Sequence, residues 1–246
     1  MIEIDMTGSV VVVTGASGGI GAGIADRFAA AGATLVLQHH RSAAPRVDGK
    51  FATVQLDVTQ PGAAQELIDQ AVDRFGRVDA LINNAGVQSV AGFDEIRDEQ
   101  WAEMIDTNLT ACHRLTQVFA RHISGREAEG SVVHIASIEG TQPAPGHSHY
   151  SVSKAALIMH AKAAAVELGA SGIRINAVSP GLIHRDGIED AWPEGVRRWL
   201  EKAPLGRMGQ STEIGDACVF LCSPLARWIT GINLVVDGGV SARSTW

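Results

Sequence analysis

The stretch TGASGGIG, residues 14–21, follows a short apolar run and opens an alanine-rich segment that has helical character. It contains four glycines, Gly15, Gly18, Gly19 and Gly21. Glycines at the turn from a strand into a helix let the backbone approach a pyrophosphate, which the free N–H groups at the start of the helix bind. A strand-to-helix turn by itself needs only one glycine. Four glycines in this context therefore predict a dinucleotide-binding loop.

On either side of this loop, apolar or β-rich runs alternate with amphipathic or alanine-rich runs. Several β-rich runs are apolar throughout, which is typical of parallel strands buried on both faces. The alternation predicts βαβ units and hence an α/β fold: one Rossmann-type, doubly wound parallel sheet of about seven strands over residues 1–246, with helices on both faces. The expected strands are Val10–Thr14, Leu35–Gln38, Thr53–Leu56, Ala80–Asn83, Val132–Ala136, Arg174–Ser179 and Ile232–Val236.

Helical patterns fill most of the connections between these strands. Apolar residues recur at helical spacing, and the expected helices span Ala64–Phe75, Trp101–Phe119 and Tyr150–Leu168. The connection His39–Lys50 is the exception, because it leaves room for little helix. The sheet face beside it is expected to be thinly covered or to be covered by a partner subunit.

The composition excludes several classes of protein. The net charge is −7 and basic residues form no run, so we expect no nucleic-acid partner. No apolar stretch reaches membrane-spanning length and no leader pattern opens the chain, so we expect a cytoplasmic protein without a membrane partner. Cys112, Cys218 and Cys222 are expected to be reduced thiols. We expect no metal site, because isolated histidines usually only form hydrogen bonds.

The residues at the tip of the second expected strand distinguish NADP from NAD. This stretch reads QHHRS, residues 38–42, and lacks the carboxylate that typically binds the ribose hydroxyls of NAD. Arg41 and Ser42, with His40 beside them, could instead hold the 2′-phosphate of NADP. A polar surface turn would have a similar composition, and Gly18 stands where a second cation would strengthen the argument. We expect NADP in preference to NAD.

Two further strand ends are expected to contact the cofactor. Asp57, in LDVT (56–59), could accept a hydrogen bond from the adenine amino group. The stretch NNAG (83–86) closes the fourth expected strand with small residues, which would let a cofactor lie close to the backbone.

Tyr150 is the only tyrosine of the chain, and Lys154 follows it by four residues, so both lie on one helix face. A phenol of pKa about 10 is a poor base at neutral pH. A nearby ammonium group favours the phenolate, so we expect Lys154 to lower the pKa of Tyr150. Ser137, at the end of the fifth expected strand, could hold a substrate oxygen. These groups suit proton transfer to or from an alcohol during hydride transfer, although a tyrosine and a lysine four residues apart are also common on solvated helix faces.

With these motifs the chain resembles the short-chain dehydrogenase/reductase family over essentially its whole length. The resemblance rests on TGASGGIG (14–21), NNAG (83–86), Asn108 in TNLT, Ser137 in IASIEG, YSVSK (150–154), NAVSPG (176–181) and VDGG (236–239). It implies that Tyr150 is the catalytic acid/base and also contacts the cofactor, and that Lys154 lowers the pKa of Tyr150 and holds the nicotinamide ribose. It also implies that Ser137 orients the substrate oxygen and that Asn108 positions a water in the proton relay. The other cofactor contacts it implies are Gly15, Ser17, Gly19, Ile20, Gly21, Asp57, Val58, Asn84, Gly86, Pro180, Gly181 and Ile183.

The same resemblance implies a homotetramer, built on the helices that carry Asn108 and Tyr150 and on the C-terminal strand. The chain departs from the family pattern in PGLIHRD (180–186). Arg185 stands where many relatives carry a threonine that binds the nicotinamide carboxamide, which would put a cation near the substrate.

The substrate is expected to bind at a segment of about residues 182–208. Polar groups are dense near the expected site, and a sugar or polyol needs such groups because each buried hydroxyl must be paired. We therefore expect an NAD(P)-dependent oxidoreductase of a small polar alcohol or carbonyl, with a sugar or polyol favoured. The candidate substrate contacts are Glu139, His147, His184 and Arg185.

Two alternatives remain. One is a 3-oxoacyl thioester reductase, for which Arg207 is a candidate contact to an acyl carrier. The other is a dinucleotide-sensing regulator without catalytic activity. Such a regulator is expected to have lost part of the Ser/Tyr/Lys/Asn set, and all four residues are present.

Overall fold

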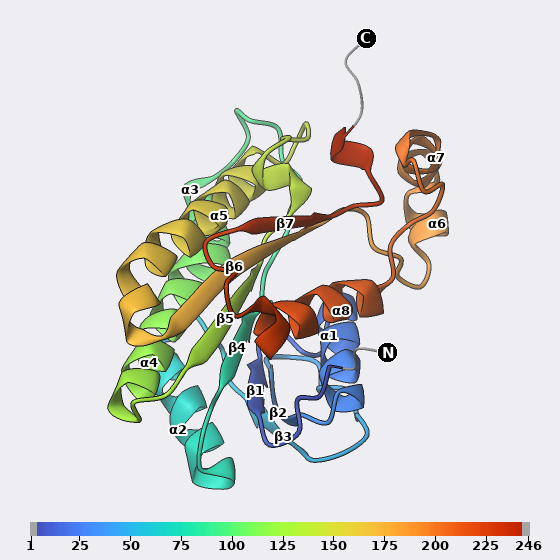
Figure 1. Ribbon diagram of the computed structural model, residues 1–246. Helices are drawn as coiled ribbons and strands as arrows, with labels where there is room; N and C mark the ends of the chain where they lie inside the picture. Colours follow the sequence, from blue (N-terminus) through green and yellow to red (C-terminus); the bar gives the residue numbers. More distant parts are fainter. Residues whose placement is uncertain (1–3, 243–246) are drawn as a thin grey trace.

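The computed structural model describes residues 4–242. Seven strands form one parallel sheet in the order β3-β2-β1-β4-β5-β6-β7 (Figure 1). The strands are β1 Val10–Val13, β2 Thr34–His39, β3 Phe51–Gln55, β4 Ala80–Asn83, β5 Gly130–Ile135, β6 Ile173–Pro180 and β7 Asn233–Val236. Each expected strand is therefore present with its ends shifted by at most a few residues, and the Rossmann-type fold predicted from the sequence is confirmed.

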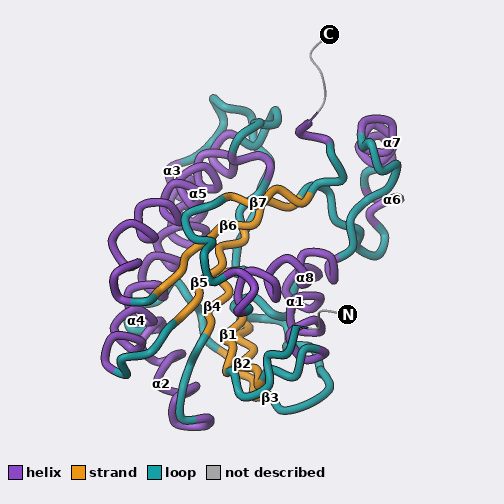
Figure 2. The backbone as a smooth tube through the Cα atoms, viewed as in Figure 1, coloured by secondary structure: helices purple, strands orange, loops and turns teal. Residues whose placement is uncertain are grey.

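Helices cover both faces of this sheet (Figures 1 and 2). The helices are α1 Gly19–Ala30, α2 Ala63–Phe75, α3 Asp98–Ile105, α4 Ala111–Gly125, α5 Ser148–Leu168, α6 Ile188–Ala191, α7 Pro193–Lys202 and α8 Ser211–Cys222. On one face α1 packs against α8, and on the other α2, α4 and α5 lie side by side. A π-helical turn over Asp106–Thr110 joins α3 to α4, so the expected long helix is continuous but locally widened.

The hydrophobic core consists of two layers, one on each side of the sheet. Successive side chains of a strand point to opposite faces, and β1 shows this alternation. Val12 contributes to the layer that contains Phe119 of α4, whereas Val11 and Val13 contribute to the layer that contains Phe28 of α1. All five side chains are fully buried. This two-sided burial explains why the strands are apolar throughout.

The short connection between β2 and β3 contains no helix over residues 40–50, as its length predicts. Ala44 and Val47 of this connection pack against the core layer of α1. The loop therefore covers this part of the sheet with its own apolar side chains.

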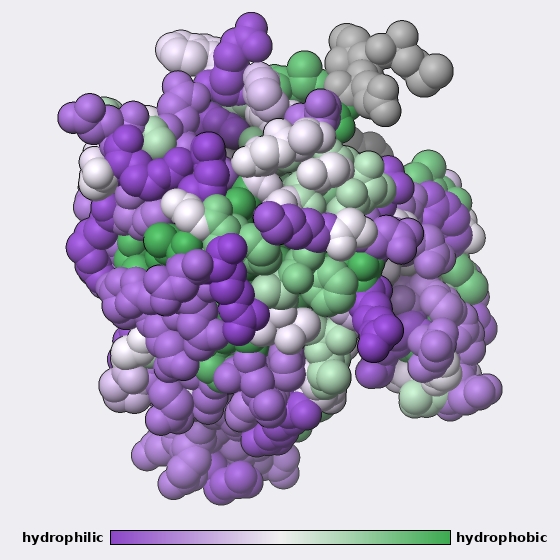
Figure 3. All heavy atoms as spheres, turned by 90° about the horizontal axis from the view of Figure 1, so that it is seen from below, coloured by the Kyte–Doolittle hydropathy of each residue, from purple (hydrophilic) through white to green (hydrophobic). Residues whose placement is uncertain are grey.

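The topology fixes where a ligand can bind. The sheet order reverses between β1 and β4, and ligands of such sheets bind beyond the carboxyl ends of the strands at this switch point. Figure 3 shows one face of the molecule, on which hydrophilic side chains surround a paler, more apolar area. Within residues 4–242, no helix combines the length and the apolar character needed to cross a bilayer.

Candidate functional site

A cavity of about 570 Å³ opens at the carboxyl ends of β1, β2, β3 and β4. Its volume lies within the range of about 300–1,000 Å³ that is usual for small-molecule and cofactor sites. It lies at the switch point of the sheet. The residues that line it are Gly15, Ser17, Gln38, His40, Arg41, Ser42, Asp57, Val58, Thr59, Gln60, Pro61, Ala85, Gly86, Val87, Glu103, Asp106 and Thr107.

Side chains from β2 and from the end of β4, the two strands on either side of β1, hold the glycine loop at the edge of this cavity. The Gln38 side chain accepts a hydrogen bond from the Gly15 N–H at 2.8 Å and donates to the Leu56 carbonyl at 2.7 Å, so it joins the loop to the end of β3. The Asn84 amide donates to the carbonyls of Thr14 and Gly15 at 2.9 and 3.0 Å. Asn84, expected as a cofactor contact, thus also positions the loop. The sequence analysis did not predict that Gln38 holds the glycine loop, although its position at the end of the second expected strand, in QHHRS, places it beside that loop.

The loop has space for a dinucleotide on one side only. At Gly15, φ is +62° and a Cβ atom would lie 2.8 Å from the Cα of Ala85, so only glycine fits. A Cβ at Gly21 would overlap the Gly15 carbonyl oxygen. By contrast, a Cβ at Gly19 would meet no atom within 4 Å. The first turn of α1 begins at Gly19 without a side-chain cap, which leaves its N–H groups available to an anion.

These features fit a dinucleotide, and the rim of the cavity fits its adenosine end. His40, Arg41 and Ser42 all line the cavity and are exposed. Asp57 also lines it, but its carboxylate accepts hydrogen bonds from the N–H and hydroxyl of Thr59 at 2.9 and 2.7 Å. These hydrogen bonds outweigh burial and lower the pKa of Asp57, so the group is an anionic acceptor at neutral pH.

Ser137, Tyr150 and Lys154 meet where β5 ends against the first turns of α5. Ser137 is buried, and its hydroxyl accepts a hydrogen bond from the N–H of Glu139 at 3.1 Å. The Ser137 hydroxyl lies close enough to the phenol of Tyr150 to lower its pKa. The Lys154 Nζ lies 5.6 Å from the centre of the Tyr150 ring and donates to the Ile135 carbonyl at 2.8 Å. The fold therefore assembles a hydroxyl, a phenol and an amine from two elements.

The pKa values of this group differ from the expectation. Burial raises the pKa of Tyr150 to about 12, the nearby Ser137 hydroxyl opposes this rise, and the charge of Glu139 adds to it. Burial also lowers the pKa of Lys154 to about 8. The Lys154 ammonium is itself desolvated and donates to a backbone carbonyl, and the lowering of the Tyr150 pKa by Lys154 stays a prediction. Tyr150 is thus a proton donor at neutral pH.

Asn108 connects the cofactor side of the site to α5. It lies in the π-helical turn and is fully buried. Its side-chain oxygen accepts from the Val87 N–H at 2.8 Å, and its side-chain nitrogen donates to the Val87 carbonyl and to the Ser153 hydroxyl, both at 3.0 Å. The side chain therefore joins Val87 to α5. The role that the resemblance implies for Asn108, positioning a water, stays a prediction.

The turn after β6 carries the residues expected at the nicotinamide. A Cβ at Gly181 would lie 2.5 Å from the indole of Trp199, so α7 packs directly on the turn that follows Pro180. Ile183 forms a parallel bridge with Gly209. This bridge ties the beginning of the 182–208 segment to the residues after its end. The contact between Trp199 and Gly181 was missed, because the sequence offers no signal for it.

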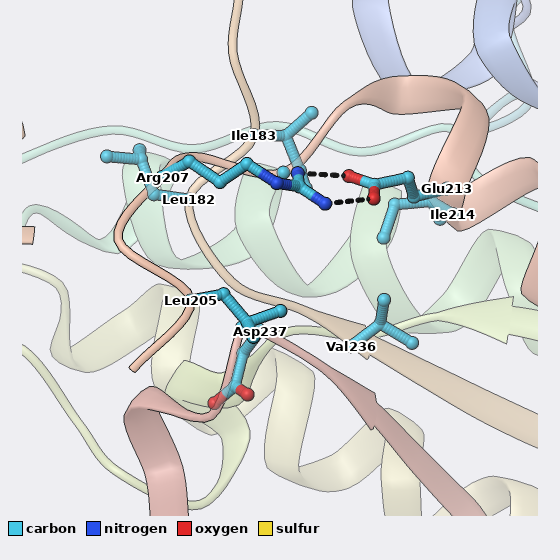
Figure 4. Close-up of a pocket in the computed structure, with 10 residues that line it drawn as sticks. Leu182, Ile183, Leu205, Arg207, Glu213, Ile214, Val236 and Asp237 are labelled. Carbon is cyan, nitrogen blue, oxygen red and sulfur yellow. Dashed lines mark hydrogen bonds and ion pairs between the residues drawn. The ribbon is translucent and has the colours of Figure 1, made fainter. Parts of the chain in front are cut away.

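A second, smaller cavity of about 90 Å³ lies beside this turn (Figure 4). It is lined by Leu182 and Ile183, and by Arg207 and Glu213, which form two hydrogen bonds of 2.8 and 2.5 Å. The volume is that of about three water molecules, so the cavity is too small for a substrate. The ion pair instead fixes the segment to the first turn of α8.

The four candidate substrate contacts fall into two groups. Glu139 and His147 lie near Tyr150 and pair with each other, with 3.0 Å between His147 Nδ1 and Glu139 Oε2. His184 lies 3.5 Å from Glu189 of α6, and Arg185 is exposed. Within residues 4–242, no three His, Cys, Asp or Glu side chains are placed to hold a metal ion.

Comparisons with known proteins agree with this geometry. Residues 15–241 match the family described as Enoyl-(Acyl carrier protein) reductase. A 3-oxoacyl-(acyl-carrier-protein) reductase of Vibrio cholerae is 33% identical over 242 residues, which cover 96% of this chain and 99% of the relative. Glucose 1-dehydrogenase 2 of Bacillus subtilis is 32% identical over 248 residues, which cover 96% of each chain.

A solved structure extends the comparison to the fold. The crystal structure of a short-chain type dehydrogenase/reductase from Mycobacterium marinum matches with a TM-score of 0.88 and 32% identity, covering 97% of this chain and 98% of that one. The resemblance found in the sequence is thereby confirmed. This chain belongs to the short-chain dehydrogenase/reductase family, whose members are nicotinamide-dependent oxidoreductases of hydroxyl and carbonyl groups.

Proposed function

We propose that this protein interconverts a secondary alcohol and the corresponding ketone on a small polar substrate, with a sugar or polyol favoured. The observation that carries the proposal is the meeting of Ser137, Tyr150 and Lys154 beside the dinucleotide-sized cavity. Gly86 lines that cavity, and a Cβ on it would lie 3.6 Å from the Lys154 Nζ. The acid/base group and the cofactor site are therefore contiguous, as hydride transfer requires.

Each side chain has a defined task in this reaction. When bound, the nicotinamide supplies the hydride in reduction and accepts it in oxidation. Tyr150 donates a proton to the carbonyl oxygen in reduction and takes it back in oxidation. Ser137 holds the same oxygen by a hydrogen bond. Lys154 would hold the nicotinamide ribose and, with a pKa lowered by burial to about 8, it can exchange a proton near neutral pH.

The direction of the Tyr150 shift predicts how the two reaction directions depend on pH. Oxidation needs the phenolate, whose fraction below the pKa rises by about tenfold per pH unit. Reduction needs the phenol, which predominates until the pH reaches the raised pKa. We expect kcat/KM for oxidation to rise between pH 6 and 9 by up to about tenfold per pH unit. The ionisation of Tyr150 should leave kcat/KM for reduction nearly constant over the same range. Equal pH profiles in the two directions would contradict this assignment.

We further propose that NADP(H) is preferred to NAD(H). Arg41 and Ser42 line the rim of the cavity, and within residues 4–242 the Arg41 guanidinium has no ion pair or hydrogen bond. A free guanidinium suits a phosphate because it donates two parallel hydrogen bonds. His40 lies close enough to Asp57 to lower its pKa, so the rim also carries a second basic group.

The substitution Arg41→Ala tests this preference. We expect it to weaken NADPH binding by about 10- to 100-fold, because a hydrogen bond to a charged group contributes about 1.5–3 kcal/mol. NADH binding should change little. Arg46→Ala, in the same connection and also exposed, is the matched control and should alter neither affinity. Titration of each variant with both cofactors by calorimetry separates these outcomes, and an equal loss of both affinities would argue against a phosphate site.

Reduction of a 3-oxoacyl thioester is the second candidate. It is favoured by relatives such as the Vibrio cholerae enzyme. One observation weighs against it: Arg207, the candidate contact to an acyl carrier, is engaged in two hydrogen bonds with Glu213. A polar substrate bound by the 182–208 segment agrees better with the charged groups beside Tyr150.

We also propose that the protein is a homotetramer. On α5, Val152, Met159 and Val166 are spaced by seven residues and are 47%, 60% and 85% exposed. At the β7 edge of the sheet, Trp228 is 98% exposed and Val235 of β7 is 41% exposed. Two exposed apolar surfaces, one on a helix and one at a sheet edge, suit two kinds of contact between copies, and hence a closed tetramer.

A charge placed on the α5 surface should separate the copies. We expect Met159→Glu to reduce the mass in solution to half or less of the wild-type assembly, because the charge would be buried in the contact. Val90→Glu, at a loop residue that is 73% exposed, should leave the mass unchanged. Light scattering after size-exclusion chromatography measures both. A wild-type monomer would refute the proposal.

The proposed activity is tested first by cofactor binding and then by turnover. Thermal-shift titration with NAD, NADH, NADP and NADPH identifies the cofactor, and a screen of sugars, polyols, ketones and acyl thioesters follows with the best one. Turnover on polar alcohols or carbonyls supports the proposal. Cofactor binding without turnover on any of these substrates would instead favour a dinucleotide-sensing regulator.

A further inference from the structure

Glu139 and His147 form a pair of charged and polar groups at the mouth of the catalytic site. The His147 Nδ1 lies 3.0 and 3.2 Å from the two carboxylate oxygens of Glu139. The Ser151 hydroxyl lies 3.5 Å from one of them, and Gln88 approaches the same imidazole nitrogen at 3.4 Å. The pair thus joins the turn after β5 to the start of α5.

This pair faces the reacting groups. The backbone N–H of Glu139 donates to the Ser137 hydroxyl, and the negative charge of Glu139 raises the pKa of Tyr150. The His147 ring stands edge-on to the Tyr150 ring, with 6.3 Å between the ring centres. A substrate oxygen held between Ser137 and Tyr150 therefore has Glu139 and His147 as its neighbours.

The pair has unused capacity for hydrogen bonds. A carboxylate offers about four acceptor positions, and the contacts with His147 and Ser151 fill only part of them. Within residues 4–242, His147 Nε2 has no hydrogen-bond partner. The side chains of Glu139 and His147 are 18% and 19% exposed, so both are largely removed from water yet open to a small ligand. A carboxylate in this situation is costly unless a donor satisfies it.

A purely structural role is the simpler alternative, because an ion pair between neighbouring turns would also stabilise the loop that connects them. Such a role would be equally well served by a pair that points to solvent. The His184–Glu189 pair, with side chains 37% and 51% exposed, is an example of that kind. The burial of Glu139 beside the phenol distinguishes the first pair from the second.

We propose that Glu139 and His147 bind a hydroxyl group on the carbon next to the reacting carbon, so that the substrate class is the α-hydroxy ketone in reduction and the vicinal diol in oxidation. This inference rests on the proposed function, in which Ser137 and Tyr150 hold the reacting oxygen. A hydroxyl both donates and accepts, so it can donate to the Glu139 carboxylate and also bond to the His147 imidazole. An ammonium group can only donate. The methylene group of a 3-oxoacyl thioester can do neither and would leave the remaining acceptor positions of the carboxylate unfilled.

The test compares carbonyl probes that differ at one group. Acetoin carries a hydroxyl next to its carbonyl, butan-2-one lacks it, and ethyl acetoacetate carries a methylene in a 3-oxo ester. With NADPH as reductant, we expect kcat/KM for acetoin to exceed that for butan-2-one by about 10- to 100-fold. Glu139→Gln should reduce this ratio to a few-fold, mainly by lowering kcat/KM for acetoin. Glu167→Gln, at an exposed position of α5, should leave the ratio unchanged.

The single tyrosine gives a second readout that needs no substrate. Because Tyr150 is the only tyrosine of the chain, the ultraviolet absorbance of the phenolate reports on it alone. Glu139→Gln removes a negative charge that opposes the phenolate, so it should lower the pKa of Tyr150, whereas Glu167→Gln should not. A purely structural pair far from the phenol would leave both the pKa and the substrate ratio unchanged.

The outcomes separate this inference from the proposed function. Equal turnover of acetoin and butan-2-one, or preferred turnover of ethyl acetoacetate, would overturn the inference while the oxidoreductase activity stands. A ratio that survives Glu139→Gln would also overturn it. Absence of turnover on all three probes counts against both the inference and the proposed function. Discrimination that Glu139→Gln removes, together with a lowered pKa of Tyr150, supports the inference.

Discussion

Replacing Tyr150 with phenylalanine is expected to lower kcat by about 10²- to 10⁴-fold, the usual contribution of a positioned acid/base group. The phenol oxygen is the only atom removed, and the phenylalanine ring fills the same space. Cofactor binding should be nearly unchanged, since the cavity is lined by other residues. Steady-state kinetics in both directions, with calorimetric titration of NADPH, measure the two effects separately.

Two companion variants define the meaning of this result. Ser137→Ala should cause a smaller loss of kcat, because the phenol can still donate its proton while the substrate oxygen loses one hydrogen bond. Ser42→Ala, at the rim of the cavity, should affect cofactor binding but not the chemical step. If Tyr150→Phe retained wild-type turnover, the proton would have another donor and the assignment of the acid/base group would fail.

The second large effect is expected at two glycines of the cofactor loop. Gly15→Ala should lower the free energy of unfolding by about 2–4 kcal/mol, because a positive φ and a close backbone contact both exclude a Cβ. Gly19→Ala should leave stability unchanged or raise it, since its Cβ meets no protein atom and alanine is the better helix former. Dinucleotide binding should nevertheless be lost in Gly19→Ala, because the free space is where the pyrophosphate is expected.

Chemical denaturation and cofactor titration of both variants distinguish these effects. The difference between the two variants is more informative than the stability or the affinity of either one. A stable Gly19→Ala protein that no longer binds NADPH would locate the pyrophosphate at the first turn of α1. If Gly19→Ala bound NADPH as tightly as the wild type does, the cofactor would lie elsewhere in the cavity.

The sequence predicted the architecture because the determinants of the fold are local. Each strand is a short apolar run. Helix α2 ends at Phe75, as predicted, and Gly76 after it has the left-handed backbone that favours glycine. The absence of a helix over residues 40–50 followed from the length of the connection. These features depend on residues that are neighbours in the chain.

What could not be predicted depends on contacts between distant segments. Gln38 braces the glycine loop because β2 lies beside β1 and β3, and Trp199 packs on Gly181 because α7 folds back over the end of β6. The pKa of Tyr150 follows from burial, which the spacing of Tyr150 and Lys154 does not reveal. The pairing of Glu139 with His147 is another such contact, although each residue alone was a candidate.

The central claim is that this chain transfers a hydride between a nicotinamide and a carbonyl carbon, with Tyr150 as the proton donor. The most direct test uses NADPH labelled with deuterium at the transferable position and acetoin as the acceptor, with mass spectrometry of the diol product. The account predicts one deuterium on the new carbinol carbon with the wild type and almost no product with Tyr150→Phe. A product without deuterium, or equal labelling by both proteins, would contradict it.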